Sequence, residues 1–450
     1  MTLTPSSARP IALAAFALGL GLRFAFLDYE TPDVTLYLRP WYLYAAEHGW
    51  AALATGFTNY TPVYTYLLVA VAQLDGLAAP LTLVKLISYP FEFGSALLAA
   101  RLVGLVDPRP ERRAIAFTAV WLAPSVLHNG AFWGQCDSIW TFFLLLALLL
   151  FCRDRMGPGF VAFAVACSVK LQAVFLGPLV LALIWRRPAR AAWLLAIPVV
   201  YLALAIPALL AGRPLREILL LYADQAGAFP SLSKGAANLY LLIPDSLYGP
   251  GLVVGLVATL VAGLVFAARV GRAPKLPPEH LLLAAAVSLA LVPFLLPKMH
   301  DRFFYPFELV VIVLACIRPF LVPVAAMAQV TSALCTLPFD GRGDVAQPVA
   351  GLAMLVILLY LASLLGRALA GRFGPDGALS GNREAFTRPS AALWFAFAIY
   401  MAGLQAASAF WGMGRLWPAL PEPVGLAAFA VILAGVVWAL RRAECTRVAA

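Results

Sequence analysis

The chain has 450 residues, of which 63% are hydrophobic and only 12% carry a charge, whereas soluble domains carry about 25%. Long apolar runs recur along nearly the whole length, as in multi-spanning α-helical membrane proteins. This composition excludes a soluble enzyme. The net charge of +10 does not indicate nucleic-acid binding, because the arginines mostly mark the ends of apolar runs.

The first apolar run, Ile11 to Leu27, has no small-residue cleavage site after it, which favours a membrane span over a signal peptide. With the arginine clusters in the cytoplasm, the chain crosses the membrane about 14 times and both termini lie inside. The expected spans are residues 10–27, 81–103, 112–127, 138–152, 157–170, 171–185, 191–211, 249–268, 280–297, 303–317, 320–338, 348–366, 391–411 and 423–440. We therefore predict an all-α, polytopic membrane protein.

Residues 28–80, between the first two spans, are expected on the outer side. From Asp33 to His48 the aromatic and polar residues fit an amphipathic helix in the membrane interface. Residues 60–74 look like a span, but a helix of about 15 residues reaches only about 22 Å, short of the roughly 30 Å hydrocarbon core. We expect an interfacial or partly re-entrant helix there, because a true span would move Arg101 to Arg113 outside.

The loop of residues 298–302 holds the densest charge. Lys298, His300, Asp301 and Arg302 lie between two apolar runs, and each ionisable group costs several kcal/mol in hydrocarbon. The cluster must therefore lie at a membrane surface or in a wet cavity, where two cations and an imidazole can bind a phosphate. A snorkelling helix end would explain Lys298 and Arg302 but not the other two residues.

Other outer segments add polar groups on the same side. Gln135 and Asp137 end the loop of residues 128–137, and Asn238 lies in the loop of residues 212–248. Lys170 lies where two short spans meet at the outer surface. The alternatives are ordinary ones, namely a helix-capping loop for the first pair, a cap for the asparagine and a snorkelling helix end for the lysine.

An ordered set of motifs spans residues 28–306. It comprises Pro32-Asp33-Val34, Glu47-His48-Gly49, Asn59-Tyr60-Thr61-Pro62-Val63-Tyr64, Phe132-Trp133-Gly134-Gln135-Cys136-Asp137-Ser138, Lys170-Leu171-Gln172, Ala237-Asn238-Leu239-Tyr240 and Met299-His300-Asp301-Arg302-Phe303-Phe304-Tyr305-Pro306. The set resembles the GT-C fold glycosyltransferases that use polyprenyl-phosphate sugars, in particular bacterial relatives of the GPI-anchor second mannosyltransferase and of the dolichyl-phosphate-glucose glucosyltransferases. In two departures, Thr61 replaces the first proline of the usual pair, and residues 233–238 lack the usual upstream asparagine.

The resemblance implies an inverting transfer of a hexose, mannose or glucose, from a polyprenyl-phosphate donor to a lipid or glycan acceptor on the outer face of the cytoplasmic membrane. This chemistry needs a base for the hydroxyl proton and cations for the departing phosphate. Asp33 is the candidate base, with Asp28 and Glu30 as alternatives and a plain loop acid as the ordinary interpretation. The candidate donor-phosphate ligands are His300, Arg302, Lys298 and Lys170, and the candidate acceptor contacts or supporting residues are Gln135, Asp137, Asn59, Tyr60, Asn238 and Asp301.

Residues 1–317 are assigned to the catalytic module and residues 318–450 to additional C-terminal membrane helices. The second outer loop has one carboxylate, Asp137, which supplies too few ligands for a Mg²⁺ or Mn²⁺ site. We therefore predict transfer without a metal or cofactor. The expected partners are the lipid donor, the acceptor and the bilayer, with no nucleic acid and a monomeric chain. Alternatives are a lipid-linked-sugar flippase or transporter and a non-catalytic partner in an envelope complex, although polar residues collect at one face rather than at the midplane expected of a transporter.

Overall fold

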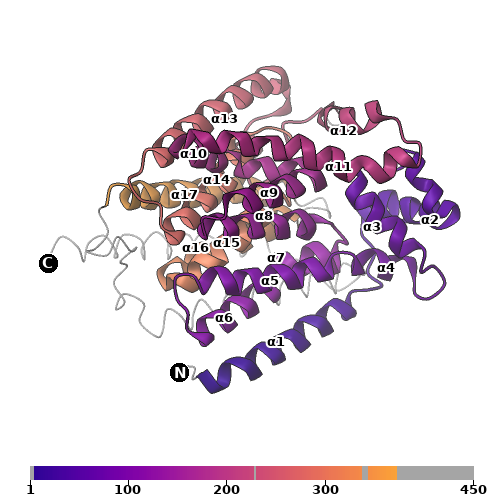
Figure 1. Ribbon diagram of the computed structural model, residues 1–450, viewed down its shortest axis with the longest axis horizontal. Coiled ribbons are helices and arrows are strands. Elements are labelled where there is room, and N and C mark those ends of the chain that lie inside the picture. The colour runs from indigo at the N-terminus through magenta and orange to yellow at the C-terminus, as the bar shows by residue number, and fades with distance from the viewer. Residues whose placement is uncertain (1–4, 228–229, 337–342, 372–450) are drawn as a thin grey trace.

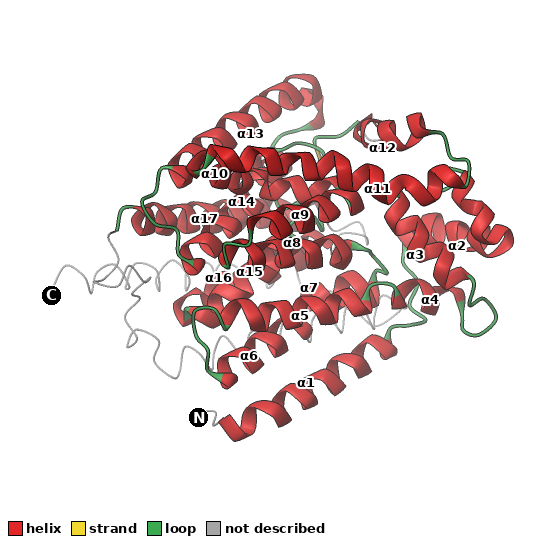
Figure 2. Cartoon of the chain, in the orientation of Figure 1, coloured by secondary structure: helices red, strands yellow, loops and turns green. Residues whose placement is uncertain are grey.

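The computed structural model describes residues 5–227, 230–336 and 343–371, and helices make up nearly all of this part (Figure 2). Each of the twelve spans expected before residue 371 contains a helix. In chain order they are α1 (Pro5–Ala25), α5 (Tyr89–Val103), α6 (Pro110–Trp121), α8 (Asp137–Cys152), α9 (Met156–Val169), α10 (Gly177–Arg186), α11 (Ala196–Leu210), α13 (Tyr248–Gly271), α14 (Pro278–Leu295), α15 (Tyr305–Ile317), α16 (Val322–Thr336) and α17 (Gly343–Leu369). The two spans expected at 391–411 and 423–440 lie outside the described residues.

These helices divide by length into two groups. Six helical segments of the described chain are long and apolar enough to cross a membrane alone, and a bent pair, Pro110–Trp121 with Pro124–Phe132, makes a seventh. The helices α8, α9 and α15 are shorter, at 16, 14 and 13 residues. Every residue of α15 is buried, so protein rather than lipid covers the irregular backbone at its ends, as a membrane interior requires.

The arginine-rich turns gather at one end of the helix bundle. Arg190 Nη2 lies 2.9 Å from Asp154 Oδ1, and Arg186 donates to the Ala273 carbonyl. Arg318 pairs with Glu279 at 2.7 Å, and Arg112 Nη1 donates to the Cys316 carbonyl at 3.4 Å. These contacts join the turns around residues 112, 154, 188, 273 and 318 into one basic end.

The segment of residues 28–80 begins and ends at the opposite end of the bundle. Lys85 Nζ, in α4 (Pro80–Leu86), donates to the carbonyl oxygens of Phe26 and Tyr29, the latter at 2.7 Å. Between these points lie α2 (Arg39–His48) and α3 (Pro62–Ala72), grouped together at one side of the bundle in Figure 1. The 11 residues of α3 span about 17 Å. Whether this helix lies in the interface, as expected for residues 60–74, remains a prediction.

The helix expected from residue 33 to residue 48 consists of two parts. A single π-helical turn, η1 (Val34–Leu38), follows Asp33 and leads directly into α2. Leu36 and Leu43 are 67% and 53% exposed, whereas Tyr42 is fully buried. One face thus packs on the protein while the other presents apolar side chains outward, as an interfacial helix does.

A small parallel sheet links two loops that are far apart in the sequence. Strand β1 (Ser233–Lys234) pairs with β2 (Met299–His300), with Lys234 opposite His300. The loop of residues 212–248 also contains α12 (Leu215–Gly227), a helix that the sequence analysis did not anticipate. Backbone hydrogen bonds join the two parallel strands. The sheet therefore fixes the cluster of residues 298–302 against the earlier loop.

A buried ion pair attaches α1 to the bundle. Arg23 Nε lies 2.7 Å from Glu92 Oε2, and both side chains are fully buried. The Arg23 guanidinium also lies 3.5 Å from the centre of the Trp121 ring. In the sequence this arginine only interrupts the end of an apolar run, but the structure gives it a partner 69 residues away. The pair holds the span directly before Asp33.

Candidate active site

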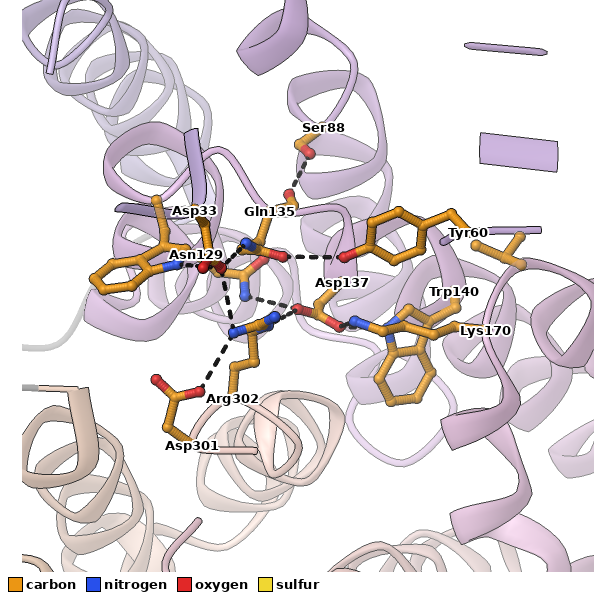
Figure 3. A network of polar contacts seen from close by, with 12 residues as sticks. Asp33, Tyr60, Ser88, Asn129, Gln135, Asp137, Trp140, Lys170, Asp301 and Arg302 are labelled. Atoms are coloured by element: carbon orange, nitrogen blue, oxygen red, sulfur yellow. Dashed lines mark hydrogen bonds and ion pairs between the residues drawn. The ribbon is translucent and has the colours of Figure 1, made fainter. Parts of the chain in front are cut away.

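Asp33 lies just before η1, where its carboxylate faces the loop that precedes α8 (Figure 3). Its Oδ2 accepts hydrogen bonds from Gln135 Nε2 at 2.6 Å and from Trp133 Nε1 at 2.9 Å. The second oxygen, Oδ1, accepts no hydrogen bond from the residues that the structure describes. Asp33 is thus oriented by two neutral donors and retains one oxygen for another partner.

The loop before α8 is shaped to present both donors to Asp33. Gly134 separates Trp133 from Gln135 and has a φ of +68°, a conformation that glycine adopts without strain. Ser88 Oγ donates to the Gln135 carbonyl at 2.6 Å, which attaches this turn to α5. The Gln135 amide oxygen accepts from the Tyr60 hydroxyl at 3.3 Å. Burial raises the pKa of the Tyr60 phenol, so the hydroxyl remains a donor.

Arg302 is the central cation of the site. Its Nη1 lies 3.6 Å from Asp33 Oδ2 and 3.4 Å from Asp301 Oδ1, and its Nε lies 3.5 Å from Asp137 Oδ2. Among the residues that the structure describes, none forms a hydrogen bond with its Nη2. Burial opposes its charge, but these carboxylates raise the pKa of the Arg302 guanidinium. The side chain therefore stays charged, with one nitrogen available to a ligand.

Asp137 contacts Arg302 and is itself held by a buried network of hydrogen bonds. Its Oδ1 accepts from Lys170 Nζ at 2.6 Å and from Trp140 Nε1 at 2.8 Å, and its Oδ2 accepts from Asn129 Nδ2 at 3.1 Å. The Asp137 side chain is completely buried, and that of Lys170 is 9% exposed. A buried charge of this kind needs partners, and these four residues supply them. Lys170 and Asp137 thus support Arg302.

His300 and Asp301 both lie at the edge of the small sheet, with pKa values shifted toward their neutral forms. Burial, reinforced by Arg302, Lys170 and Lys234, lowers the pKa of His300 to about 3. Burial raises the pKa of Asp301 to about 6, against the opposing effect of Arg302. His300 is therefore a neutral imidazole at pH 7 and offers a hydrogen bond rather than a positive charge.

A cavity of about 490 Å³ connects these groups. Asp33, Asn59, Tyr60, Gln135, His300, Asp301 and Arg302 from the predicted set line it, together with Pro32, Leu36, Tyr37, Leu38, Trp41, Lys234, Gly235, Cys335 and Gln347. Its lining combines aromatic side chains, Tyr37, Trp41 and Tyr60, with charged ones. The volume is that of a site for a small organic molecule, since such sites are about 300–1,000 Å³.

Four predicted residues do not line the cavity. Lys170 and Asp137 are buried behind it in their ion pair. Lys298 has a φ of +67° and its Nζ donates to the Tyr248 hydroxyl at 3.1 Å. Asn238 is fully buried and its side chain accepts from the Tyr240 amide, which caps a short helical turn. For Asn238 the ordinary interpretation as a cap is the one that the geometry fits.

The sequence analysis missed several members of the site. Trp133 and Asn129, which bond the two carboxylates, belong to the motif loop but carried no role there. Cys335 and Gln347 lie in and beside the C-terminal helices, where no motif pointed to them. The division at residue 317 remains a prediction, and residues on both sides of it line the cavity. Among the described residues no group of three or more His, Cys, Asp or Glu side chains is placed to hold a metal ion.

Comparisons with known proteins identify the fold. No family model and no curated protein matches the sequence. Among solved structures, ArnT from Cupriavidus metallidurans, determined bound to undecaprenyl phosphate, is similar with a TM-score of 0.50 and 15% sequence identity, over 88% of this chain and 77% of the ArnT chain. The chain has the GT-C fold. This confirms the predicted fold class of a helical, multi-pass membrane protein, whereas the narrower likeness to mannosyl- and glucosyltransferases remains a prediction.

Proposed function

We propose that the chain is a glycosyltransferase that moves a hexose from a polyprenyl-phosphate donor to a hydroxyl group of a lipid or glycan acceptor. One observation carries the proposal. A single cavity holds an oriented carboxylate, Asp33, 3.6 Å from a guanidinium, Arg302, and each group has an atom, Asp33 Oδ1 and Arg302 Nη2, that forms no hydrogen bond within the described part of the chain. The same fold in ArnT, determined with undecaprenyl phosphate, supports a lipid phosphate as the ligand.

In this proposal Asp33 acts as the general base. The acceptor hydroxyl attacks the anomeric carbon, and Asp33 Oδ1 takes its proton. The bond from the anomeric carbon to the phosphate oxygen breaks, and the lipid phosphate leaves with the electron pair. A single displacement from the opposite face inverts the anomeric centre. A positioned base typically contributes about 10²- to 10⁴-fold.

The departing phosphate would lie against Arg302 and His300. The free Nη2 of Arg302 can donate to a phosphate oxygen in a charge-assisted hydrogen bond. The neutral imidazole of His300 can add a second donor, and Lys234 lies on the same wall of the cavity. The aromatic side chains Tyr37 and Trp41, which also line the cavity, provide flat apolar surfaces against which a sugar ring can stack.

The finer assignments follow from the sequence. The donor sugar is mannose or glucose, as the motif resemblance implies, and the reaction uses no metal, because Asp137 is the one carboxylate of the second outer loop. The basic end of the bundle faces the cytoplasm under the positive-inside rule, so the cavity faces the outer side of the cytoplasmic membrane and both termini lie inside. The chain acts as a monomer.

The test is sugar transfer in membranes that contain the parental chain or Asp33→Asn. Radiolabelled polyprenyl-phosphate mannose and polyprenyl-phosphate glucose are supplied separately, and label is followed into lipid and glycan fractions. Asparagine keeps the shape of the side chain, and its carbonyl oxygen can still accept the hydrogen bonds from Trp133 and Gln135. It removes the basicity of the carboxylate. We expect transfer to fall by about 10²-fold or more, at unchanged protein level and unchanged donor binding.

Two variants provide matched controls. Asp28 and Glu30 are exposed acids near Asp33 that do not line the cavity, so Asp28→Asn and Glu30→Gln should transfer sugar at the parental rate. A loss in one of these two variants, with Asp33→Asn active, would move the base upstream. A flippase would instead move the labelled lipid across the bilayer with its sugar–phosphate bond intact in every variant.

A further inference from the structure

A second cavity lies at the basic end of the bundle, far from the Asp33 site. Its volume is about 400 Å³. Helix α8 begins with Asp137 at the first site and ends with Cys152 on the wall of this cavity, so its 16 residues separate the two by about 24 Å. The cavity is enclosed by the turn between α8 and α9, the end of α10, and the turn between α13 and α14. The proposed reaction does not use it.

The wall of this cavity carries an excess of positive charge. Arg186, Arg187 and Arg190 all line it, and among the residues that the structure describes Asp154 is the one carboxylate that joins them there. Arg190 lies 2.9 Å from Asp154, and Arg187 lies 4.0 Å from the same carboxylate. Three guanidinium groups therefore share one acid, which leaves two positive charges uncompensated by the wall.

The third arginine is positioned by neutral groups. Arg186 donates to the carbonyl oxygens of Ala273 and Pro274, the latter at 3.5 Å. The side chain of Arg190 is only 11% exposed, and its Nη1 donates to the Leu183 carbonyl at 3.4 Å. Carbonyl acceptors orient a guanidinium without cancelling its charge. The cavity thus has two oriented cationic donors, Arg186 and Arg190, and a third, more exposed arginine, Arg187, at 69% exposure.

The surroundings place this cavity at the depth of lipid headgroups. Trp185 and Trp193 beside it are 49% and 46% exposed, and tryptophans of membrane proteins collect at the interface with the headgroups. The adjoining spans Pro188–Leu210 and Asp245–Gly271 are only 11% and 22% buried in the protein, so they present apolar surface to lipid. Phe151 and Leu281 provide an apolar floor.

We propose that this cavity binds the phosphate of an anionic membrane lipid. A headgroup phosphate would place its negative charge among the three arginines, while the glycerol and acyl chains would lie along the exposed faces of α11 and α13. Basic pockets between membrane helices on the cytoplasmic side are suited to such headgroups. A free phosphate ion shares the charge but gains nothing from the apolar surface, which is why the lipid is favoured.

Native mass spectrometry of the whole chain in detergent tests this proposal. The protein is titrated with dioleoyl-phosphatidylglycerol, with dioleoyl-phosphatidylcholine, or with inorganic phosphate as a competitor. Because the Asp33 cavity also holds cationic side chains, Arg302 and Lys234, the readout is the change that each variant of the basic end causes in affinity for phosphatidylglycerol. We expect Arg187→Gln to weaken binding by about fivefold, the effect of one arginine near a membrane surface.

Two further variants separate binding from folding. Asp154→Asn removes the competing carboxylate, so we expect phosphatidylglycerol to bind about fivefold more tightly, which a misfolded variant would not do. Asparagine is suited to the φ of +55° at this position. Arg109→Gln is the matched control, because Arg109 is 59% exposed at the same end and pairs with Asp107 outside the cavity. It should bind like the parental chain.

We thus expect phosphatidylglycerol to bind more weakly to Arg187→Gln, more tightly to Asp154→Asn and equally well to Arg109→Gln. Phosphatidylcholine should bind weakly to every variant. Equal effects of Arg187→Gln and Arg109→Gln, or no gain in Asp154→Asn, would overturn the proposal. Displacement of phosphatidylglycerol by inorganic phosphate at similar concentration would also overturn it, because the site would then be one for a soluble anion.

Discussion

The ion pair between Asp137 and Lys170 supports a quantitative prediction about the stability of the site. The carboxylate is fully buried, the ammonium is 9% exposed, and the two atoms are 2.6 Å apart. Asp137→Asn keeps the shape, and its single carbonyl oxygen can still accept the hydrogen bond from Trp140 Nε1, but an NH2 group takes the place of the oxygen that accepts from Asn129. It removes the only negative charge within 4 Å of Lys170 among the described residues.

The cost of this change is set by the unpaired lysine. Removing one partner of a buried ion pair costs about 3–5 kcal/mol, because the remaining charge stays buried without compensation. Arg302, whose Nε lies 3.5 Å from the same carboxylate, loses one of its three acidic neighbours as well. We therefore expect Asp137→Asn to lower the free energy of unfolding by at least about 3 kcal/mol and to lower sugar transfer through a displaced Arg302.

A second substitution should recover part of the loss. Lys170→Met replaces the ammonium by an apolar side chain of similar length, and apolar replacement of a buried ion pair is often neutral. The double variant Asp137→Asn/Lys170→Met should therefore be more stable than Asp137→Asn by about 2 kcal/mol, within the range of coupling energies for residues in contact.

Thermal unfolding of the detergent-solubilised chain, followed by tryptophan fluorescence, measures the order of stabilities. Asp224→Asn serves as the control, because Asp224 is an exposed acid on α12. The reasoning is refuted if Asp137→Asn unfolds at the same temperature as Asp224→Asn, or if adding Lys170→Met lowers the stability further.

Three predictions concern the other charged groups. Arg302→Lys keeps the charge but not the planar fork, and should lower transfer by about 10-fold or more with unchanged unfolding temperature. Because His300 is neutral at pH 7, His300→Gln, which retains a donor, should transfer more sugar than His300→Ala in the same assay. The pKa of Asp301 is raised from 3.8 to about 6, so this group stabilises the fold below about pH 4 and loses that contribution as the pH rises through 6. Asp301→Asn should therefore be more stable than the parental chain at pH 7.5, on the order of 1–3 kcal/mol, with the difference vanishing near pH 4 in urea unfolding; an unchanged difference between the two pH values would contradict this assignment.

The sequence by itself determined the helical bundle and the end at which the chemistry collects. The length and polarity of an apolar run are local properties, and water and lipid act on them directly. The twelve helices before residue 371 therefore match the expected spans. That the short run at residues 60–74 does not cross the membrane remains a prediction, because α9 and α15 are about as short and were expected as spans. Alternation of direction along the chain then brings Asp33, Gln135, Lys170 and the cluster of residues 298–302 to the same end.

Only the tertiary structure decided which of these polar groups meet. Lys170 and Lys298 look alike in the sequence, yet the first pairs with Asp137 and the second turns to Tyr248. The direction of a side chain depends on the rotation of its helix and on the backbone conformation of its loop, and both are set by packing against distant elements. The pairing of β1 with β2 and the ion pair of Arg23 with Glu92 join residues 66 and 69 positions apart, and no local pattern encodes such contacts.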